Sequence, residues 1–282
     1  MRKLPIVLGL ALTLVVSGGA FASFFDNFDS YATGPLSTVS GGVWRTWGGN
    51  STDAQVVTGG LSPPNAQMHN GIGTPDVVTY WDSIMQSNLG HWARVSFDFL
   101  VHETPNTDPA LNDIEGDVTF TSGDPLLNDI DYGTGLGILR INTGPVSPGY
   151  TCVRWWDLDG LNGGGEVPFD ALVADQLALD VWHHVDVIAT LTVADPLAND
   201  PLLADGTFDV FVDGALGLSA TFGWENPRGW NATEIWSYAD ADPIDEDYFL
   251  VDNFEAVPVP EPSSLLALGG FLPALALLRR RK

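Results

Sequence analysis

The chain has 282 residues, and 45% of them are hydrophobic, which is enough for one sizeable core or two small ones. Its 36 acidic residues outnumber its 11 basic ones, so the formal net charge is −25 at pH 7. This composition excludes a basic nucleic-acid-binding module, a coiled coil and a multi-span membrane protein.

The first segment has the three-part pattern of a cleaved secretory signal peptide. Arg2 and Lys3 form a short basic region, Leu4–Val16 is an apolar run, and Ala20 and Ala22 occupy a small-x-small cleavage site. The apolar run is short for a membrane span. We therefore expect signal peptidase to remove the chain up to and including Ala22.

Residues 23–256 are typical of a single all-β domain. Ala93–Val101 and Val181–Val193 alternate apolar and polar residues, and Asp213-Gly214 between two alternating runs predicts a hairpin. Further predicted strands are Gly135–Asn142, Tyr150–Trp156, Thr207–Val212 and Tyr248–Glu255. No window has the pattern of a convincing amphipathic helix, and Phe169–Asp180 is the best short one. Many strands joined by Gly, Pro and Asp turns predict an antiparallel β-sandwich or barrel.

Four short motifs follow one another in a recognisable order: Phe25–Tyr31, Trp182–Val187, Phe208–Gly214 and Phe249–Phe254. This order resembles the concanavalin-like and laminin-G-like jelly rolls of many surface proteins. The resemblance implies two curved antiparallel sheets in which the first and last strands are adjacent.

The cysteine and histidine residues singled out in this sequence do not indicate a disulfide, a nucleophile or a metal-binding pair. Cys152 is the only cysteine, so we expect a small buried hydrophobe rather than a disulfide or a nucleophile. His183 and His184 are adjacent in a predicted strand and should point to opposite faces, so we do not expect a chelating pair.

The strongest catalytic candidate is a carboxylate motif that lacks one member. Laminarinase-type glycoside hydrolases, which share the jelly-roll architecture, carry Glu-x-Asp-x-x-Glu along one strand. Glu115 and Asp117 begin such a motif, but Phe120 stands where the second Glu should be. We therefore expect Glu115 and Asp117 to be acidic residues of a loop that precedes a strand. We expect no catalytic residue and no enzymatic activity. A glycan-active hydrolase is the alternative, which requires two carboxylates about 5–10 Å apart across a cleft.

Aromatic residues suggest where a glycan could bind. The chain has ten tryptophans, and Trp155 and Trp156 are candidate stacking platforms for a sugar. Neighbouring residues of a strand point to opposite faces, so one of the two should point away from the core. Ordinary core packing is the alternative.

Two acidic clusters are candidate Ca²⁺ sites, because Ca²⁺ prefers several hard oxygens from a flexible loop. Residues 240–247 hold five carboxylates, and residues 157–166 form the second cluster. The metal ligands that we expect in the first cluster are Asp240, Asp242, Asp245 and Asp247. A solvated acidic turn is the alternative, and we expect no other cofactor.

Residues 257–282 form a three-part tail. Pro260, Glu261 and Pro262 precede the apolar stretch Leu265–Leu278, and the chain closes with four cations: Arg279, Arg280, Arg281 and Lys282. This tail resembles the PEP-CTERM sorting signal of Gram-negative bacteria. The resemblance implies transient inner-membrane association through a hydrophobic helix, processing by an exosortase, and delivery to the cell surface or the exopolysaccharide matrix. An ordinary tail anchor is the alternative.

These features together predict an exported, non-catalytic surface or matrix protein. Its candidate partners are signal peptidase and exosortase during export, and polysaccharide afterwards. Nucleic acid is not expected as a partner, because so acidic a surface repels it.

Overall fold

The computed structural model describes residues 24–46, 54–61, 65–69, 77–85, 92–102, 114–124, 126–127, 129–131, 137–142, 150–156, 170–191, 204–224, 230–239 and 248–259. Within these residues the chain is almost entirely β-structure, with one short helix, α1 (Leu36–Val39). All strand pairs are antiparallel.

Among the described residues, nine strands form the first sheet, sheet A. In spatial order they are β15 (Ala215–Trp224), β14 (Ala204–Val212), β13 (His183–Leu191), β7 (Trp92–His102), β17 (Tyr248–Val259), β5 (Asn65–His69), β4 (Gln55–Thr58) and β2 (Gly34–Pro35), while β1 (Phe24–Asp26) pairs with β17. The first and last strands are therefore adjacent, as the jelly-roll resemblance implies.

The second sheet, sheet B, has eight strands in the described part of the chain. Their order is β12 (Asp170–Ala178), β11 (Tyr150–Trp156), β10 (Gly137–Asn142), β8 (Ile114–Asp124), β16 (Trp230–Ala239), β6 (Val77–Met85) and β3 (Trp44–Thr46), while β9 (Asp129–Asp131) pairs with β8.

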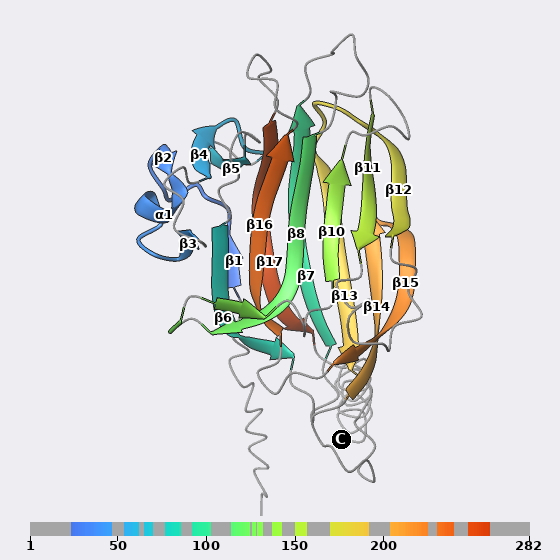
Figure 1. Ribbon diagram of the computed structural model, residues 1–282. Coiled ribbons are helices and arrows are strands. Elements are labelled where there is room, and N and C mark those ends of the chain that lie inside the picture. Colours follow the sequence, from blue (N-terminus) through green and yellow to red (C-terminus); the bar gives the residue numbers. More distant parts are fainter. Residues whose placement is uncertain are drawn as a thin grey trace, which may run out of the picture.

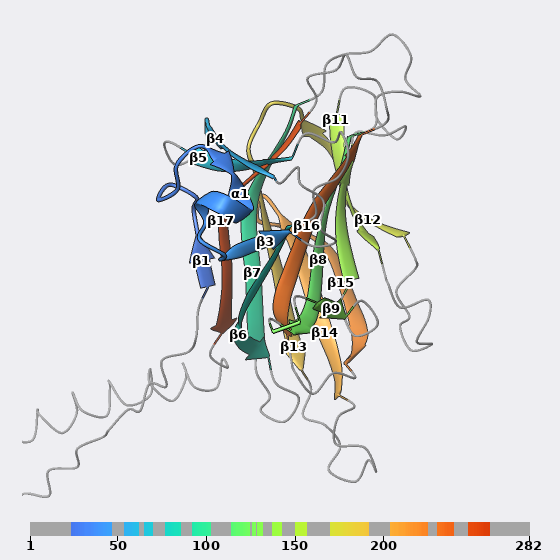
Figure 2. The ribbon, with the colours of Figure 1, turned by 60° about the vertical axis from the view of Figure 1, so that its left-hand side comes forward.

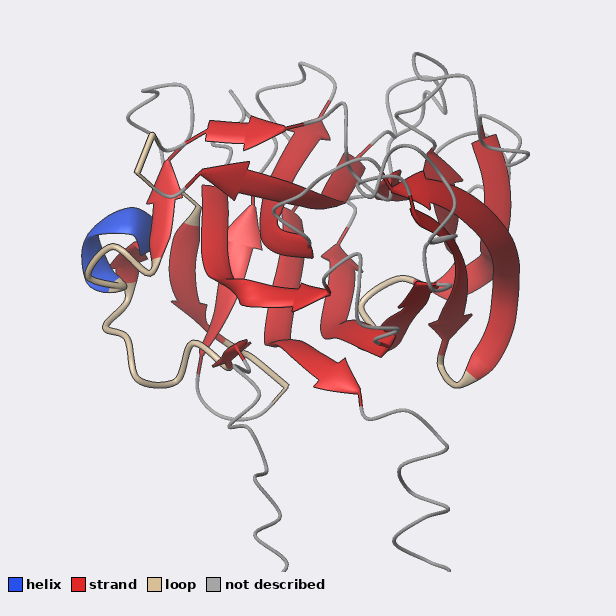
Figure 3. Cartoon of the chain, turned by 90° about the horizontal axis from the view of Figure 1, so that it is seen from below, coloured by secondary structure: helices blue, strands red, loops and turns tan. Residues whose placement is uncertain are grey.

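The two sheets pack face to face as a jelly-roll sandwich. Strands β16, β8, β10 and β11 of sheet B lie in front of strands of sheet A (Figure 1). Figure 2 shows β1 beside β17, and Figure 3 shows α1 at one side of the curved strands. Between the sheets lies one core of apolar side chains, in which Phe97 and Phe99 of sheet A face Phe120, Trp155 and other residues of sheet B.

Most strand predictions are confirmed, because alternation with a period of two is a local property of the sequence. The window Tyr150–Trp156 is β11, and Asp213 and Gly214, both with positive φ, form the turn between β14 and β15. Phe169–Asp180, the best short window for a helix, contains strand β12, which pairs with β11. Pairing with a neighbouring strand overrides weak helical propensity.

Two single-residue predictions are also confirmed. Cys152 is buried. His183 is buried on the core side, with its ring centroid 5.5 Å from that of Phe99, whereas His184 contacts Asp98 and Asp186 on the opposite face of sheet A.

No helix in the described part of the chain is long and apolar enough to cross a membrane. The predicted signal peptide and the predicted tail from Pro260 onward lie outside the described residues.

Candidate active site

Ionisable side chains gather on the outer face of sheet B, which is the face turned away from sheet A. Val118 and Phe120 of β8 point into the core, so Asp117 and Thr119 lie on the outer face. Asp117 is directly opposite Arg140 of β10, and Thr119 is directly opposite Glu234 of β16. Three adjacent strands therefore place these polar residues together at the centre of the sheet.

Asp117 and Arg140 form a bidentate ion pair. Arg140 Nε donates to Asp117 Oδ1 at 3.1 Å, and Nη2 donates to Oδ2 at 3.0 Å. The Asp117 side chain is fully buried and that of Arg140 is 17% exposed. Burial raises the pKa of Asp117 above its ordinary value, although the adjacent guanidinium of Arg140 opposes this shift.

Glu234 supplies a second carboxylate beside Asp117. Its Oε2 lies 3.5 Å from Thr119 Oγ1, and this hydroxyl donates to the Glu234 backbone oxygen at 2.9 Å. Thr233 Oγ1 in turn donates to the backbone oxygen of Thr119 at 2.7 Å. Glu234 is fully buried, like Asp117. The bonds to the backbone oxygens hold β8 and β16 together at the position of Glu234.

The strand register sets the spacing of the two carboxylates. Because Trp236 is opposite Asp117 and Glu234 is opposite Thr119, Asp117 and Glu234 are diagonal neighbours on adjacent strands. Diagonal neighbours in an antiparallel sheet are about 7–8 Å apart at the backbone. Glycosidase carboxyl pairs lie about 5–10 Å apart, so the register allows this pair to meet that requirement.

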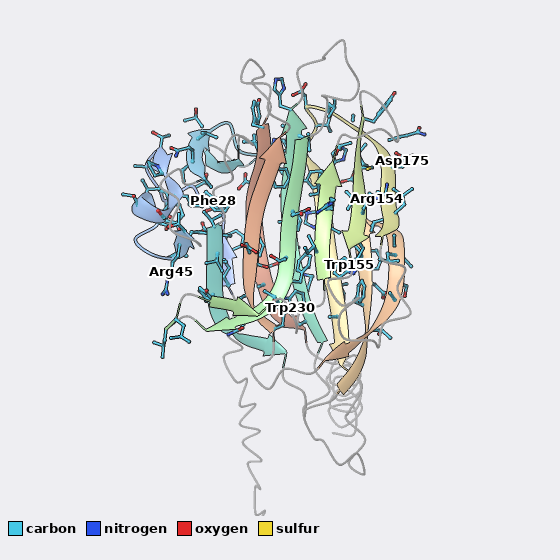
Figure 4. The ribbon with its side chains drawn as sticks, in the orientation of Figure 1. Phe28, Arg45, Arg154, Trp155, Asp175 and Trp230 are labelled. Atoms are coloured by element: carbon cyan, nitrogen blue, oxygen red, sulfur yellow. The ribbon has the colours of Figure 1, made fainter. Side chains whose placement is uncertain are left out.

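A second arginine extends the polar face away from Glu234. Arg154 of β11, labelled in Figure 4, is directly opposite Arg140 in the strand register. Its side chain is half-buried. On the next strand, Leu172 of β12 is opposite Arg154 and is 47% exposed. The outer face thus passes from buried carboxylates to partly exposed arginines and then to an exposed apolar side chain.

The carboxylate motif differs from the expectation in two ways. Glu115 and Asp117 lie inside strand β8 rather than in a loop before it, and nothing is described of the Glu115 side chain. Phe120 does not occupy a catalytic position, because it packs in the core against Trp155, with ring centroids 5.6 Å apart. The second carboxylate comes instead from Glu234 on another strand.

The proposed stacking role of Trp155 is wrong. Its side chain is fully buried, and its ring centroid lies 4.3 Å from that of Phe208 on the opposite sheet, so no sugar can stack on it. Trp156 lies on the outer face by alternation, but its side chain is outside the described residues.

The predicted metal ligands cannot be placed. Residues 240–247 and 157–166 lie outside the described part of the chain. In the part that is described, no three His, Cys, Asp or Glu side chains form a group that could hold a metal ion.

The outer face of sheet A carries a different polar cluster, in which the side chains bind one another. Asp98 Oδ1 lies 2.6 Å from His184 Nδ1, and Asn253 Nδ2 donates to Asp98 Oδ2 at 2.8 Å. His184 Nε2 also lies 3.3 Å from Asp186 Oδ2. These contacts tie β7, β13 and β17 together, so we assign this cluster a structural role.

Solved structures with a similar fold include a glucanase, an alginate lyase and a carbohydrate recognition domain. An endo-1,3-β-glucanase from Streptomyces sioyaensis is 12% identical with a TM-score of 0.50, and the match covers 83% of this chain and 95% of that one. The alginate lyase Aly36B, in complex with an alginate trisaccharide, is 14% identical with a TM-score of 0.47 (85% and 99% coverage). The Emp47p carbohydrate recognition domain is 13% identical with a TM-score of 0.46 (86% and 98% coverage).

At these identities the likeness concerns the fold alone. No protein-family model matches the sequence, and no curated protein matches it. Function must therefore be argued from the residues of the site.

The sequence-based prediction that the protein is not an enzyme is contradicted, because the fold of this chain is also that of an endo-1,3-β-glucanase. The prediction also assumed that the second carboxylate must lie on the same strand as Glu115 and Asp117. Glu234 reaches the same face from β16, which no pattern within β8 could reveal.

Burial of Asp117 has a testable consequence for stability. A carboxyl whose pKa is higher in the folded state binds more protons when folded than when unfolded. Between the unfolded pKa, about 3.9, and the higher folded pKa, the free energy of unfolding should fall as pH rises. Asp117→Asn removes this dependence, so the stability difference between wild type and variant should shrink as pH rises through that window.

Urea unfolding measured from pH 4 to pH 8 checks this expectation. Asp209→Asn is a suitable control, because Asp209 is only half-buried on β14. A stability difference between wild type and Asp117→Asn that stays constant with pH would contradict the assignment.

Proposed function

We propose that this protein is a glycan-active enzyme, a glycoside hydrolase that uses Asp117 and Glu234. One observation carries the proposal: two fully buried carboxylates from neighbouring strands share one face of a jelly-roll sheet. Buried ionisable groups are costly and are concentrated at functional sites. Hydrolysis of a glycosidic bond requires two carboxyl groups at this kind of separation.

The environments of the two groups suggest their roles. The raised pKa of Asp117 suits it to give a proton to the oxygen of the leaving sugar. Glu234, when ionised, would take a proton from the attacking water or attack the anomeric carbon itself. Arg140 acts as a positioning residue, because its two hydrogen bonds fix the orientation of the Asp117 carboxyl.

Access to the site requires a change when substrate binds. Both carboxylates are fully buried in the free protein, so the proposal requires that the site opens to admit glycan. Carbodiimide labelling with peptide mapping detects such opening. Labelling of Asp117 and Glu234 should be slow but measurable in the free protein, and a slowly hydrolysed oligosaccharide, which covers both groups, should suppress it.

A turnover screen of the purified protein tests the proposed function. The substrates are neutral β-glucans, galactans and polyuronates, and new reducing ends are measured. Release of saturated oligosaccharides would support hydrolysis, whereas an unsaturated product would show that the reaction is β-elimination. Absence of turnover across the panel would refute the proposal that the protein is an enzyme that acts on these classes of substrate.

We also propose that the protein is exported and sorted to the surface or the extracellular matrix of a Gram-negative bacterium. The support is the signal-peptide pattern and the PEP-CTERM-like tail in the sequence. The last strand, β17, runs to Val259, three residues past the predicted domain boundary at 256, and ends directly before Pro260 of the tail motif.

Mass spectrometry of protein from the native envelope tests this proposal. We expect Ser23 as the N-terminus and loss of peptides from Leu265–Leu278. In a strain without exosortase the whole tail should remain. An intact Met1 would contradict export by this route, and persistence of the tail in the surface fraction would indicate an ordinary anchor.

The acidic segment 240–247 is proposed to bind Ca²⁺ weakly and to stabilise the fold. Five carboxylates in eight residues repel one another, and extracellular modules bind Ca²⁺ with Kd values around 10⁻⁴–10⁻³ M. A tenfold excess of ion over Kd should add about 1.4 kcal/mol. Thermal melting with Ca²⁺ and with chelator, at matched ionic strength, measures the shift. A shift that is unchanged in Asp242→Asn/Asp245→Asn would remove the site.

A further inference from the structure

Three of the chain's five histidines contact an aspartate, and all three contacts lie at one end of the sandwich. His102 ends β7, and His183 and His184 begin β13, which runs antiparallel beside β7. Asp180 contacts His102, and Asp213 contacts His183. None of these residues belongs to the proposed catalytic site on sheet B.

The ring of His183 lies between two hydrogen-bond acceptors. Its Nδ1 is 2.8 Å from Asp213 Oδ2, and its Nε2 is 3.0 Å from the backbone oxygen of Ala178, the last residue of β12. A neutral imidazole has one N–H donor, whereas the imidazolium cation has two. A carboxylate and a carbonyl oxygen have no proton to donate, so both bonds form only when the His183 ring carries two protons.

The surroundings of Asp213 assign the shared proton to the ring. The Asp213 side chain is 49% exposed, and its other oxygen accepts from the His184 backbone N at 2.9 Å. Carboxyl groups in contact with water are ionised at neutral pH. The bond between His183 and Asp213 is therefore a charge-assisted one, and its length is in the usual range for an N–H donor of positive charge and a carboxylate.

The ring of His184 has a similar arrangement on the opposite face of sheet A. Its Nδ1 is 2.6 Å from Asp98 Oδ1, and its Nε2 is 3.3 Å from Asp186 Oδ2. Both neighbours are carboxylates, so a neutral ring would turn a bare nitrogen toward one of them. Further charged side chains on this face are Arg94 of β7 and Asp252 and Glu255 of β17.

The sequence has few other cations to pair with these aspartates. Between the two terminal segments it contains five arginines and no lysine, against 36 acidic residues in the whole chain. On the outer face of sheet A, Arg94 is paired with Glu255 and its Nε lies 3.8 Å from Asp186 Oδ1. Protonated histidines therefore supply positive charge where lysine is absent and arginine is scarce.

We propose that His183 and His184 are imidazolium cations in the folded protein, and that His183 forms a pH-dependent lock with Asp213 and Ala178. This lock joins the turn between β14 and β15 of sheet A to the end of β12 of sheet B, strands that lie together at the right of Figure 1. Loss of one proton from the ring breaks one of its two bonds. The connection between the edges of the two sheets therefore loosens as pH rises.

The direction of the effect on stability follows from proton binding. In an unfolded chain a histidine loses its proton near pH 6.5, which is about its ordinary value. A folded state that retains the proton above this pH binds more protons than the unfolded state, so the free energy of unfolding falls as pH rises. The stabilisation is complete below about pH 6.5 and declines above it.

Nitrogen NMR of the purified full chain, labelled with ¹⁵N in histidine, detects the ring protons. At pH 7.5 a free histidine is about 90% neutral. We expect His183 and His184 to give imidazolium signals at this pH, assigned through their loss in His183→Gln and His184→Gln. A neutral ring at His183 would overturn the lock, and a neutral ring at His184 would overturn its assignment as a cation.

Asp213→Asn tests the lock without removing the turn. Asparagine tolerates the positive φ of this position, and its side-chain oxygen can still accept from the His184 backbone N. Its amide group can donate to Nδ1 of a neutral His183 ring, whose Nε2–H still reaches the Ala178 oxygen. The variant should therefore hold His183 as a neutral ring at pH 7.5 in the same NMR experiment.

Urea unfolding from pH 5.5 to pH 8.5 measures the stability of the same proteins. We expect Asp213→Asn to raise the unfolding equilibrium constant about tenfold at pH 5.5, where a hydrogen bond between charged groups is lost, and by less at pH 8.5. Asp209→Asn is the matched control, because it removes the same charge from β14 and Asp209 is opposite Ile188 rather than a histidine. Its difference from wild type should not change with pH. The same pH dependence in the two variants would overturn the lock.

Discussion

Glu234→Gln is expected to lower glycan turnover at least about 100-fold, the usual contribution of a positioned acid or base. Glutamine has nearly the same shape as glutamate, and its side-chain oxygen can still lie beside Thr119 Oγ1. The fold should therefore survive, while the carboxylate that takes a proton or attacks the sugar is lost. Initial rates of reducing-end release on the best substrate of the screen measure the effect.

Three comparisons make this result specific. Circular dichroism and the melting temperature establish that the variant is folded. Glu255→Gln is the matched control, because Glu255 is paired with Arg94 on sheet A, far from the proposed site in the strand order. Turnover of Glu234→Gln equal to that of the control would exclude Glu234 from catalysis.

The pH profile adds a readout that a purely structural role would not change. Wild type should show a bell-shaped dependence of kcat/KM on pH, which belongs to the Asp117–Glu234 pair as a whole. Asp117→Asn should remove one limb of the bell and leave the other. A profile that keeps its shape and only decreases in height would indicate a structural contribution of Asp117.

Gly217→Ala is expected to destabilise the fold by about 3 kcal/mol, at the upper end of the usual cost of overpacking. Gly217 is the extra residue of a β-bulge in β15, between Leu216 opposite Phe211 and Leu218 opposite Val210. A Cβ at this position would lie 2.1 Å from the backbone oxygen of Val173 on β12. A backbone atom cannot rotate away, so one strand must move.

The cost arises where the two sheets meet. β12 is the edge strand of sheet B and β15 is the edge strand of sheet A, so Gly217 allows the two edges to approach closely. Urea unfolding measures the change, with Ser219→Ala as a control at an exposed position two residues along the same strand. The control should change stability by less than about 0.5 kcal/mol. Equal unfolding midpoints for the two variants would show that the edges are not in contact.

The two variants probe different properties of the same sandwich. Glu234 lies in the central strands of sheet B, where strand pairing positions the carboxylates. Gly217 lies at the edge of sheet A, where β15 approaches edge strand β12 of sheet B. A loss of activity without a loss of stability is expected only for Glu234→Gln. A Glu234→Gln variant that loses stability but keeps its activity would indicate that the reactive groups lie elsewhere on the protein.

Local patterns in the sequence predict several of the strands and which of their residues face the core. The alternation over Ala93–Val101 corresponds to β7, and Asp213-Gly214 correctly predicts the hairpin between β14 and β15. The opposite orientations of His183 and His184 follow from the same period. These features depend on near neighbours in the chain, so local patterns are sufficient to predict them.

The pairing of strands that are far apart in sequence is visible only in the three-dimensional fold, and the candidate site depends on this pairing. Thr119 and Glu234 are 115 residues apart in sequence, and the bond between them exists because β8 pairs with β16. A period of two assigns a residue to a face but does not identify its cross-strand partner. Glu234 stands between Thr233 and Ile235, both buried, and an acidic residue in so apolar a strand was the one local signal of its importance. The Arg140–Arg154 pair is likewise a product of strand register, because like charges are brought together only when β10 and β11 align.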